Sequence, residues 1–228
     1  MSTGKEYPRG YGPLESVSDY RPWELDERFL ESAEAVGAHT KVDIYRLWEL
    51  WQLVGQTRHL PGDLLEVGVW RGGSAGLMGK ALSTFSIERH LWLADTFTGV
   101  VKAGPKDDYY KGGEHADTSV EVVEKLLDSL GLSDYTILKG IFPEQSAHLL
   151  GGRRIALCHV DVDVYQSAKD VAHWVWPRMP VGGVIVYDDY GFYGCEGVTA
   201  FVNEEMARED RVVVHNLNGH AVVVKTEI

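Results

Sequence analysis

Two short apolar runs that each end in a pair of aspartates constrain this chain more than any other feature. The runs cover residues 155–160 and 183–187, and each has the length and composition of a buried strand. The aspartates that follow are Asp161 and Asp163 after the first run, and Asp188 and Asp189 after the second. In an open parallel sheet, ligands bind at the carboxyl ends of the strands. We therefore expect four carboxylates to lie together at one edge of a sheet.

Four neighbouring carboxylates repel one another, which costs free energy unless a proton or a cation compensates their charge. Carboxylate oxygens are hard ligands of the kind that Mg²⁺ prefers. The two aspartate pairs therefore predict a divalent metal site. The rest of the chain must indicate which reaction such a metal would serve.

From residue 61 to the end, strand-like and helix-like segments alternate. We expect strands at residues 64–69, 90–95, 135–139, 155–160, 183–187, 212–215 and 221–225. Apolar residues at helical spacing predict helices at residues 74–84, 118–130, 167–176 and 196–208. A short link with an Asn-Gly step, residues 216–219, joins the last two strands as a hairpin. This order predicts an α/β fold, a three-layer sandwich with a mixed seven-stranded sheet.

Residues 1–60 precede this core and are expected to form a helical N-terminal extension. Residues 1–21 are predicted to be poorly ordered, or ordered only against another part of a structure. Two helices are predicted, at residues 22–36 and 39–59, and the second carries an apolar stripe typical of a core-facing helix. The extension is expected to cover the open side of the sheet or to make a dimer contact.

Residues 98–117 show no periodicity and are long for a plain connection, so we expect a lid or binding loop. Five charged side chains of this loop are expected to be solvated: Lys102, Lys106, Asp107, Asp108 and Lys111. The helix after the loop is predicted to begin with a capping box made by Thr118 and Glu121.

A second motif lies between the first strand of the core and its helix, where the sequence reads Glu66-x-Gly68-x-x-x-Gly72-Gly73-Ser74. Glycines at such a turn let the backbone approach a ligand closely, and the helix N-terminus adds a positive dipole. An acid at the end of the second strand, Asp95, can bind both ribose hydroxyls of an adenosine-type cofactor. The alternative is that the glycines serve only a tight turn between strand and helix.

The glycine spacing does not match the dinucleotide pattern Gly-x-Gly-x-x-Gly, so the motif does not predict a pyrophosphate-binding turn. A carboxylate at Glu66 would also repel a polyanion. A cationic or zwitterionic cofactor suits the motif better, and S-adenosylmethionine is both.

Four segments in this order resemble the macrocin O-methyltransferase family. They are Glu-Val-Gly-Val-Trp-Arg-Gly-Gly-Ser at 66–74, Ala-Asp-Thr-Phe-Thr-Gly-Val at 94–100, Val-Asp-Val-Asp-Val-Tyr-Gln-Ser at 160–167 and Val-Tyr-Asp-Asp-Tyr at 186–190. The resemblance covers about residues 40–228. It implies a class I methyltransferase (Rossmann-like) fold, bound S-adenosylmethionine and Mg²⁺, methylation of a sugar hydroxyl in natural-product biosynthesis, and a homodimer or higher homo-oligomer.

The resemblance also assigns roles to the acids. It implies that Asp161, Asp188 and Asp189 bind the metal and that Asp163 is the general base. If the strand continues beyond Asp161, Asp163 lies on the same face of it, two residues on. The residues expected to bind the cofactor are Glu66, Gly68, Gly72, Gly73, Ser74, Asp95, Thr96, Phe97, Phe142 and Asp161.

Other roles for these residues stay open. Asp163, together with Ser167, could cap the helix predicted to begin near Ser167. His115 in the predicted lid is a second candidate for the base. His159 is expected to be a core histidine, or else to lie behind the metal.

Composition excludes some partners. A net charge of −12 argues against sequence-independent binding to nucleic acid or to an anionic membrane. The two cysteines are not in a metal-type spacing, and we expect a reducing cytoplasm. The expected partner is a small-molecule, sugar-containing acceptor, whose identity and methylated hydroxyl the sequence leaves open.

Two other functions compete with methyl transfer. A Mg²⁺-dependent phosphohydrolase of the haloacid dehalogenase type also uses an Asp-x-Asp strand, but here that strand is fourth rather than first. The acid pair at Asp188 also follows Asp163 too soon to leave room for that family's other elements. A non-catalytic S-adenosylmethionine-binding protein is the alternative that is not an enzyme. A nicotinamide dehydrogenase is disfavoured because the glycine spacing is wrong.

Overall fold

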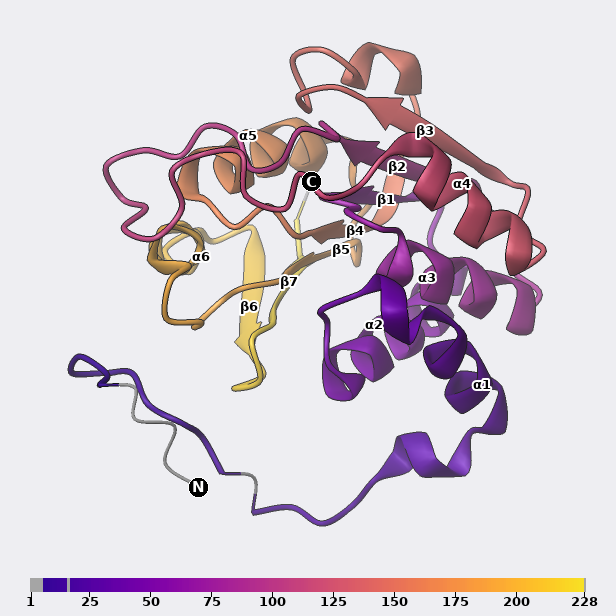
Figure 1. Cartoon of the computed structure of the whole chain (residues 1–228), viewed down its shortest axis with the longest axis horizontal. Coiled ribbons are helices and arrows are strands. Elements are labelled where there is room, and N and C mark those ends of the chain that lie inside the picture. Colours follow the sequence, from indigo (N-terminus) through magenta and orange to yellow (C-terminus); the bar gives the residue numbers. More distant parts are fainter. Residues whose placement is uncertain (1–5, 16, 228) are drawn as a thin grey trace.

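The computed structural model describes residues 6–15 and 17–227, and its centre is one mixed sheet (Figure 1). The strands are β1 (Asp63–Val67), β2 (Leu91–Asp95), β3 (Tyr135–Lys139), β4 (Ile155–Val160), β5 (Val184–Tyr187), β6 (Arg211–His215) and β7 (Ala221–Lys225). Their spatial order is β3-β2-β1-β4-β5-β7-β6. Strands β1 to β5 are parallel, and β7 pairs antiparallel with both β5 and β6. The predicted mixed seven-stranded sheet is confirmed.

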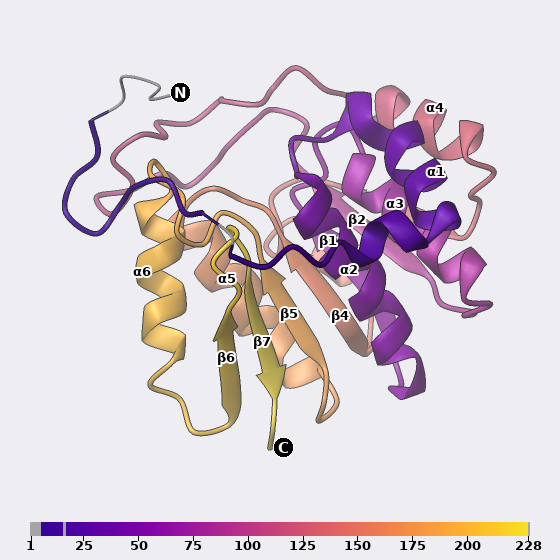
Figure 2. The same cartoon turned by 90° about the horizontal axis from the view of Figure 1, so that it is seen from below.

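Helices cover both faces of the sheet and complete the three-layer sandwich (Figures 1 and 2). They are α1 (Glu27–Val36), α2 (Ile44–Gln56), α3 (Gly73–Thr84), α4 (Val120–Ser129), α5 (Tyr165–Val175) and α6 (Glu196–Glu205). Short 3₁₀ turns occupy Pro22–Leu25, Gly37–His39, Thr57–His59, Ala147–Leu150 and Trp176–Arg178. Helices α1 to α4 share one apolar cluster with the sheet, and α5 and α6 share the other.

The two faces follow from the alternation of side chains along each strand. In β1, Leu64 packs into the cluster beneath α1 to α4, whereas Leu65 and Val67 pack toward α5. Trp51 of α2 is fully buried in the first cluster, where it contacts Phe29 of α1. The helical extension therefore covers the sheet, which is one of the two arrangements expected for it.

Several predicted helix boundaries are wrong, and side-chain caps explain two of the differences. The helix predicted at residues 22–36 is two pieces, because Asp26 adopts an extended conformation and its Oδ1 accepts the amide of Phe29. The helix predicted from residue 39 begins at Ile44, where Asp43 caps it. Helix α6 ends at Glu205 and does not reach the predicted end at residue 208.

The predicted capping box is also wrong. Ser119, not Thr118, caps α4 and accepts the amide of Val122. The Thr118 hydroxyl instead donates to the carbonyl of Trp70 and ties this helix to the glycine turn.

The N-terminal arm before α1 has no helix or strand before Pro22 among its described residues. It crosses in front of β6 and β7 in the view of Figure 2. Tyr7 and Tyr11 pack against Tyr193, with ring centroids 5.9 Å and 5.6 Å apart. The prediction of poor order for residues 1–21 falls partly on residues 1–5 and 16, which lie outside the described residues. Across the described chain, no helix combines the length and the apolar character that a membrane crossing requires.

Candidate active site

A cavity lies at the carboxyl ends of β1, β4 and β5. Strand β1 has β2 on one side and β4 on the other, and the change of direction at such a point opens a crevice in doubly wound sheets. The cavity has a volume of about 370 Å³, within the range of small-molecule sites. Its walls come from the strand ends, from residues 39–42 before α2 and from the loop 98–117.

Three of the four predicted acids form one cluster on the cavity wall. Oxygen atoms of Asp161, Asp188 and Asp189 all lie within 4.8 Å of one another. The sheet sets this spacing, because the amide of Asp161 donates to Val67 O and the amide of Asp188 donates to Val160 O, both at 2.9 Å. The carboxylates thus converge at one edge of the sheet, as the sequence predicts.

The protein compensates the charges of these carboxylates unequally. Burial and the neighbouring carboxylates raise the pKa of Asp161 and of Asp189 well above the usual range. Burial acts on Asp188 as well, but hydrogen bonding and charge from His220, with the charge of Arg46, hold its pKa below the usual range. Asp189 Oδ2 is buried without a hydrogen-bond partner in the described chain. The cluster therefore fits a cation: it offers oxygen ligands whose charge the protein leaves partly uncompensated.

Two basic residues that sequence reasoning missed hold Asp188. Arg46 of α2 donates through Nη1 to Asp188 Oδ1 at 2.6 Å, and His220 Nε2 lies 2.9 Å from the same oxygen. Arg46 Nε also donates to Asp43 Oδ2 at 2.8 Å, and His220 Nδ1 lies 2.6 Å from Glu49. Arg46 and Asp188 are 142 positions apart, so no local sequence pattern could have indicated the contact. Helix α2 is thus bound directly to the acid cluster.

The fourth acid, Asp163, lies beside the cluster, but not where a continuing strand would place it. Strand β4 ends at Val160, and Asp163 has a left-handed backbone with φ of 63°. The expectation that Asp163 shares a strand face with Asp161 is therefore wrong. Its carboxylate still comes within 4.8 Å of ligand atoms of Asp189 and Cys195. Asp189 is also left-handed, at φ of 65°, and such strained residues concentrate at functional sites.

Asp163 does not cap the following helix. No side chain caps α5 at Val164, and the amide of Tyr165 donates to Asp107 Oδ1 at 2.9 Å. Asp163 instead accepts a hydrogen bond from the Tyr110 hydroxyl, and burial raises its pKa. Its carboxylate lines the cavity and is more basic than that of a solvated aspartate.

Glu66 does not contact the cavity, so the expectation that it binds the cofactor is wrong. Its side chain is fully buried, and Oε1 lies 2.8 Å from His159 Nδ1. Alternation along β1 directs Glu66 to the face that Leu64 occupies, away from the cavity. His159 is a core histidine, fully buried. Its ring also lies behind the acid cluster, with a nitrogen within 4.8 Å of Asp188.

Asp95 lines the cavity, but its carboxylate already accepts three backbone hydrogen bonds. Oδ2 accepts the amides of Val69 and Trp70 at 2.8 Å, and Oδ1 accepts the amide of Phe97 at 2.6 Å. Since a carboxylate offers about four acceptor positions, little capacity remains for two ribose hydroxyls. Asp95 shapes the glycine turn in this structure, and its contact with a cofactor stays a prediction.

The glycines of the turn make room for protein rather than only for a ligand. A Cβ on Gly68 would lie 1.6 Å from the carbonyl oxygen of Asp161, and one on Gly73 would lie 2.6 Å from Thr40. Gly72 has φ of 87°, in the left-handed region that glycine adopts at least cost. The alternative left open for these glycines, a tight turn between strand and helix, therefore accounts for part of the motif.

Six of the ten residues expected to bind the cofactor line the cavity: Gly68, Ser74, Asp95, Thr96, Phe142 and Asp161. The four that do not are Glu66, Gly72, Gly73 and Phe97. Phe97 packs into the apolar cluster beneath α1 to α4 instead. Contact of Phe97 with a cofactor stays a prediction, and Gly72 and Gly73 contribute to the shape of the turn.

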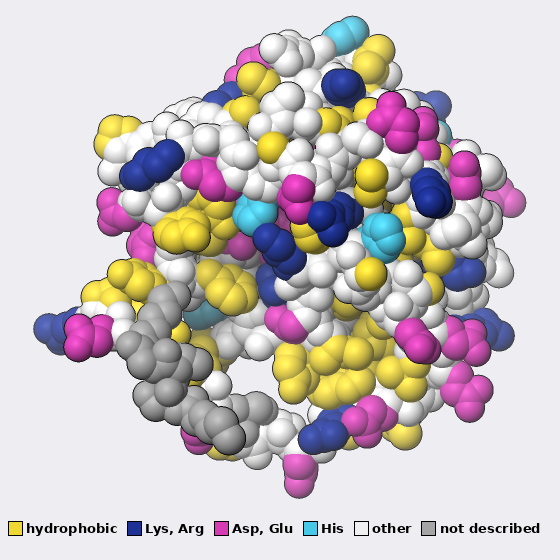
Figure 3. Space-filling model, viewed as in Figure 1, with side chains coloured by type: hydrophobic (Ala, Val, Ile, Leu, Met, Phe, Trp, Pro, Cys, Tyr) yellow, Lys and Arg dark blue, Asp and Glu magenta, His cyan; other side chains and the backbone are white. Residues whose placement is uncertain are grey.

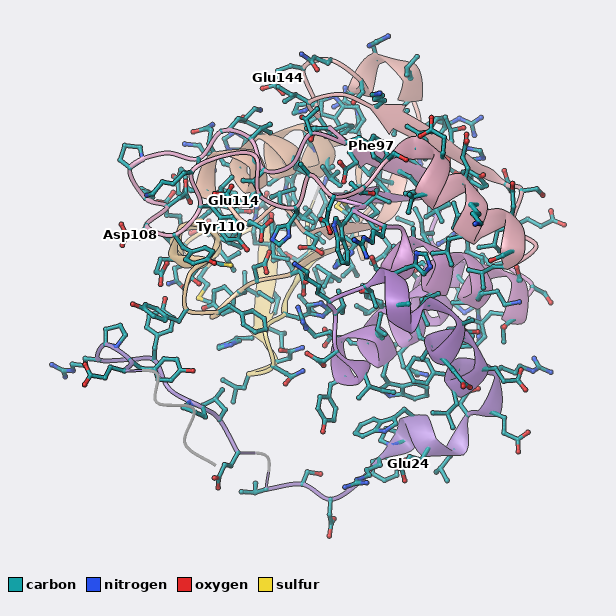
Figure 4. The ribbon with its side chains drawn as sticks, in the orientation of Figure 1. Glu24, Phe97, Asp108, Tyr110, Glu114 and Glu144 are labelled. Carbon is teal, nitrogen blue, oxygen red and sulfur yellow. The ribbon has the colours of Figure 1, made fainter. Side chains whose placement is uncertain are left out.

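The loop 98–117 is fixed to the rest of the molecule more firmly than expected. Asp107 is buried, and its carboxylate accepts the amides of Gly104 and Tyr165. Lys102 is paired with Glu144 at 2.5 Å and with Asp170 at 2.7 Å. The expectation of solvated side chains is therefore wrong for both. It holds for Asp108, which lies at the outer edge of the loop while Tyr110 lies further in (Figure 4).

A solved structure with the same architecture identifies the fold. The chain superimposes on the O-methyltransferase NovP with a TM-score of 0.70 and 27% sequence identity over 83% of each chain. Together with the seven-stranded sheet and the cavity at its switch point, this likeness defines a class I, S-adenosylmethionine-dependent O-methyltransferase.

Sequence comparison gives the family. Residues 16–220 match the macrocin-O-methyltransferase (TylF) family, and the chain belongs to it. One relative, demethyldecarbamoylnovobiocin O-methyltransferase of Streptomyces niveus, is 32% identical over 170 residues, which are 67% of this chain but only 63% of that protein.

A second relative is the 8-demethyl-8-(2,3-dimethoxy-alpha-L-rhamnosyl)-tetracenomycin-C 4'-O-methyltransferase of Streptomyces olivaceus. It is 32% identical over 191 residues, covering 78% of this chain and 72% of that protein. The family resemblance noted from the four sequence segments is confirmed.

Proposed function

We propose that this enzyme transfers a methyl group from S-adenosylmethionine to a hydroxyl of a sugar-containing small molecule, with Mg²⁺ held by Asp161, Asp188 and Asp189. One observation carries the proposal. Three carboxylates lie within 4.8 Å of one another on a cavity wall, and a fourth acid, Asp163, lines the same cavity. The name of the Streptomyces olivaceus relative, which specifies a rhamnosyl compound, supports a sugar acceptor.

S-adenosylmethionine would supply a methyl group that is already activated by its sulfonium centre, so the difficult partner is the neutral hydroxyl. A bound divalent cation would lower the pKa of an acceptor oxygen that it contacts. Asp163 would accept the proton of that hydroxyl, because it faces the cavity and burial raises its pKa toward the range useful for a general base. Tyr110, which donates to Asp163, would hold the carboxylate in place.

The positioning of the acids would depend on residues outside the cluster. Arg46 and His220 would fix Asp188 through the oxygen they share, which leaves the other oxygen of that carboxylate for the metal. Helix α2 would thereby contribute to catalysis without contacting the acceptor.

The metal is tested by assaying methyl transfer on a panel of sugar-containing acceptors, with Mg²⁺ or with a chelator. We expect turnover only with the cation, and activity that survives complete chelation would contradict the metal role. Asp188→Asn should abolish turnover and leave the affinity for S-adenosylmethionine nearly intact. Asp95→Ala should do the reverse and weaken cofactor binding first, because the turn that Asp95 holds would relax.

The choice of base is tested separately. We expect Asp163→Asn to lower kcat by about 10²-fold or more, the usual contribution of a general base. His115→Gln should lower kcat by much less, since His115 contacts Lys41 and Tyr110 rather than the acid cluster. The reverse order of effects would assign the base to His115.

We also propose a homodimer or higher homo-oligomer, which sedimentation velocity would test. The phosphohydrolase alternative is not favoured by the family assignment. Turnover in the methyl-transfer assay would separate the enzyme from a protein that only binds S-adenosylmethionine.

A further inference from the structure

The wall of the cavity also carries basic side chains, and one of them has no acidic partner in the described chain. Among the described residues, the lining includes two side chains with a permanent positive charge, Lys41 and Arg46. Arg46 is paired with Asp43 and Asp188. Lys41 has no carboxylate within ion-pair distance in the described chain. Basic and histidine side chains gather near the middle of this face of the molecule (Figure 3).

Lys41 is held against a second basic group instead. Its Nζ lies 3.0 Å from His115 Nδ1, and it also lies over the ring of Trp70, 5.0 Å from the centroid. The other ring nitrogen of His115 lies 3.4 Å from the Tyr110 hydroxyl. The Lys41 ammonium thus contacts an imidazole nitrogen and an aromatic ring but no carboxylate, and an anion would stabilise its charge. We call these two residues the Lys41–His115 pair.

The loops around the pair fix its position. His115 has a left-handed backbone with φ of 63°. The carboxylate of Glu114 accepts the amides of Lys111 and Gly112, and Val100 exchanges backbone hydrogen bonds with Gly113 and with residue 114. On the other side, the carbonyl of Lys41 accepts a hydrogen bond from Arg46. These contacts hold the backbone on both sides of the pair in place, and the Lys41 side chain itself is exposed.

The pair lines the same cavity as Asp163, the residue proposed to receive the proton of the acceptor hydroxyl. A group held by the pair would therefore share the cavity with the reacting hydroxyl. His39 also lines the cavity, and its Nδ1 is buried without a hydrogen-bond partner in the described chain.

We propose that the Lys41–His115 pair binds a phosphate group of the acceptor, so that this enzyme methylates a nucleotide-linked sugar in preference to a neutral glycoside. The proposal rests on the proposed sugar O-methyltransferase function and adds the class of substrate. A lysine ammonium is a common phosphate binder, which acts as a point charge. The arginine of the cavity wall, whose planar fork also suits phosphate, is engaged by Asp43 and Asp188. The protein carries a net charge of −12, so a local basic site is needed to bring an anionic acceptor to the cavity.

The test compares a nucleoside-diphosphate-linked hexose with the methyl glycoside of the same hexose, using the full chain with Mg²⁺. We expect kcat/KM to be at least tenfold higher for the nucleotide-linked sugar, and this preference to fall about tenfold or more in Lys41→Met. Lys41→Arg should keep most of the preference, because the positive charge stays. Lys125→Met, on the exposed side of α4, makes the same charge change away from the cavity and should leave the preference as it is.

The outcomes separate this proposal from the function on which it rests. If the enzyme methylates both sugars with equal kcat/KM, the phosphate site is wrong and the sugar O-methyltransferase function stands. If Lys41→Met raises the KM for S-adenosylmethionine and leaves the preference unchanged, the pair binds the carboxylate of the cofactor instead. If no sugar hydroxyl is methylated under any condition, the proposed function itself fails.

Discussion

The ion pair between Arg46 and Asp188 allows a quantitative test of how helix α2 supports the site. The two side chains are 7% and 3% exposed, and their nearest atoms are 2.6 Å apart. Removing one partner of a buried ion pair costs about 3–5 kcal/mol, mainly because the remaining charge is left buried without compensation. His220 would still lie 2.9 Å from the same oxygen. We therefore expect Arg46→Met to lower the free energy of unfolding by about 3 kcal/mol, the lower end of that range.

The measurement is urea unfolding of the chelated protein, followed by fluorescence of the tryptophans and extrapolated to water. Arg71→Met is the matched control. Arg71 pairs with Asp117 at the same distance, 2.6 Å, but both side chains are substantially exposed, and such pairs contribute little. Saturating Mg²⁺ should reduce the loss in Arg46→Met, because a bound cation would compensate Asp188 in place of the guanidinium.

A double variant shows whether the stranded charge is the cause. In Arg46→Met/Asp188→Asn, the buried carboxylate is gone, so we expect part of the lost stability to return relative to Arg46→Met alone. The reasoning would be refuted if the double variant were less stable than the single variant, or if Arg46→Met cost no more than Arg71→Met. Either result would mean that the charge of Arg46 does not stabilise the buried carboxylate of Asp188.

Three further predictions concern the loop, the turn and a histidine. Asp107→Ala should lower the free energy of unfolding by about 1 kcal/mol, because it leaves the amide of Tyr165 without its acceptor. Asp108→Ala at the exposed edge of the loop should leave the melting temperature unchanged. Gly68→Ala should abolish cofactor binding measured by calorimetry or prevent folding, since its Cβ would lie 1.6 Å from the carbonyl oxygen of Asp161. Burial alone would lower the pKa of His220, but its acidic partners raise it above 6.5. The stabilisation that protonated His220 gives to the folded state is therefore complete below pH 6.5 and is lost as pH rises through the folded pKa. We expect the difference in free energy of unfolding between wild type and His220→Gln, measured by urea unfolding, to shrink from pH 6 to pH 9.

The acid cluster could be predicted from the sequence because its signals are local. Each pair of aspartates directly follows an apolar run, and parallel strands bring their carboxyl ends to one edge. The position of Asp163 could not be predicted, since the strand ends at Val160 and the backbone turns into a left-handed conformation.

The residues that hold the acid cluster could not be predicted from the sequence, because they come from distant parts of the chain. Arg46 belongs to a helix whose pattern indicates only a core-facing stripe, and His220 follows a hairpin turn. The burial of Asp107 could not be predicted either, because nothing local shows that the N-terminus of α5 lies against it.

Glu66 shows a different limit of prediction from sequence motifs. Its place in a glycine motif indicated a ligand contact, but alternation along β1 turns it into the core to meet His159. A motif can therefore give the location of a site correctly and the role of one of its residues wrongly.

The segment at residues 39–46 has a consequence for engineering and for evolution. It supplies residues of the cavity wall and the arginine that holds Asp188, and its backbone occupies the space that a side chain at position 73 would need. A chain trimmed to the start of β1 would look like a complete α/β unit and would lack part of its active site. In a chimera, exchanging the first 60 residues would exchange part of the cavity wall together with the support for Asp188. Changes in this segment keep that support only if Arg46 stays in place.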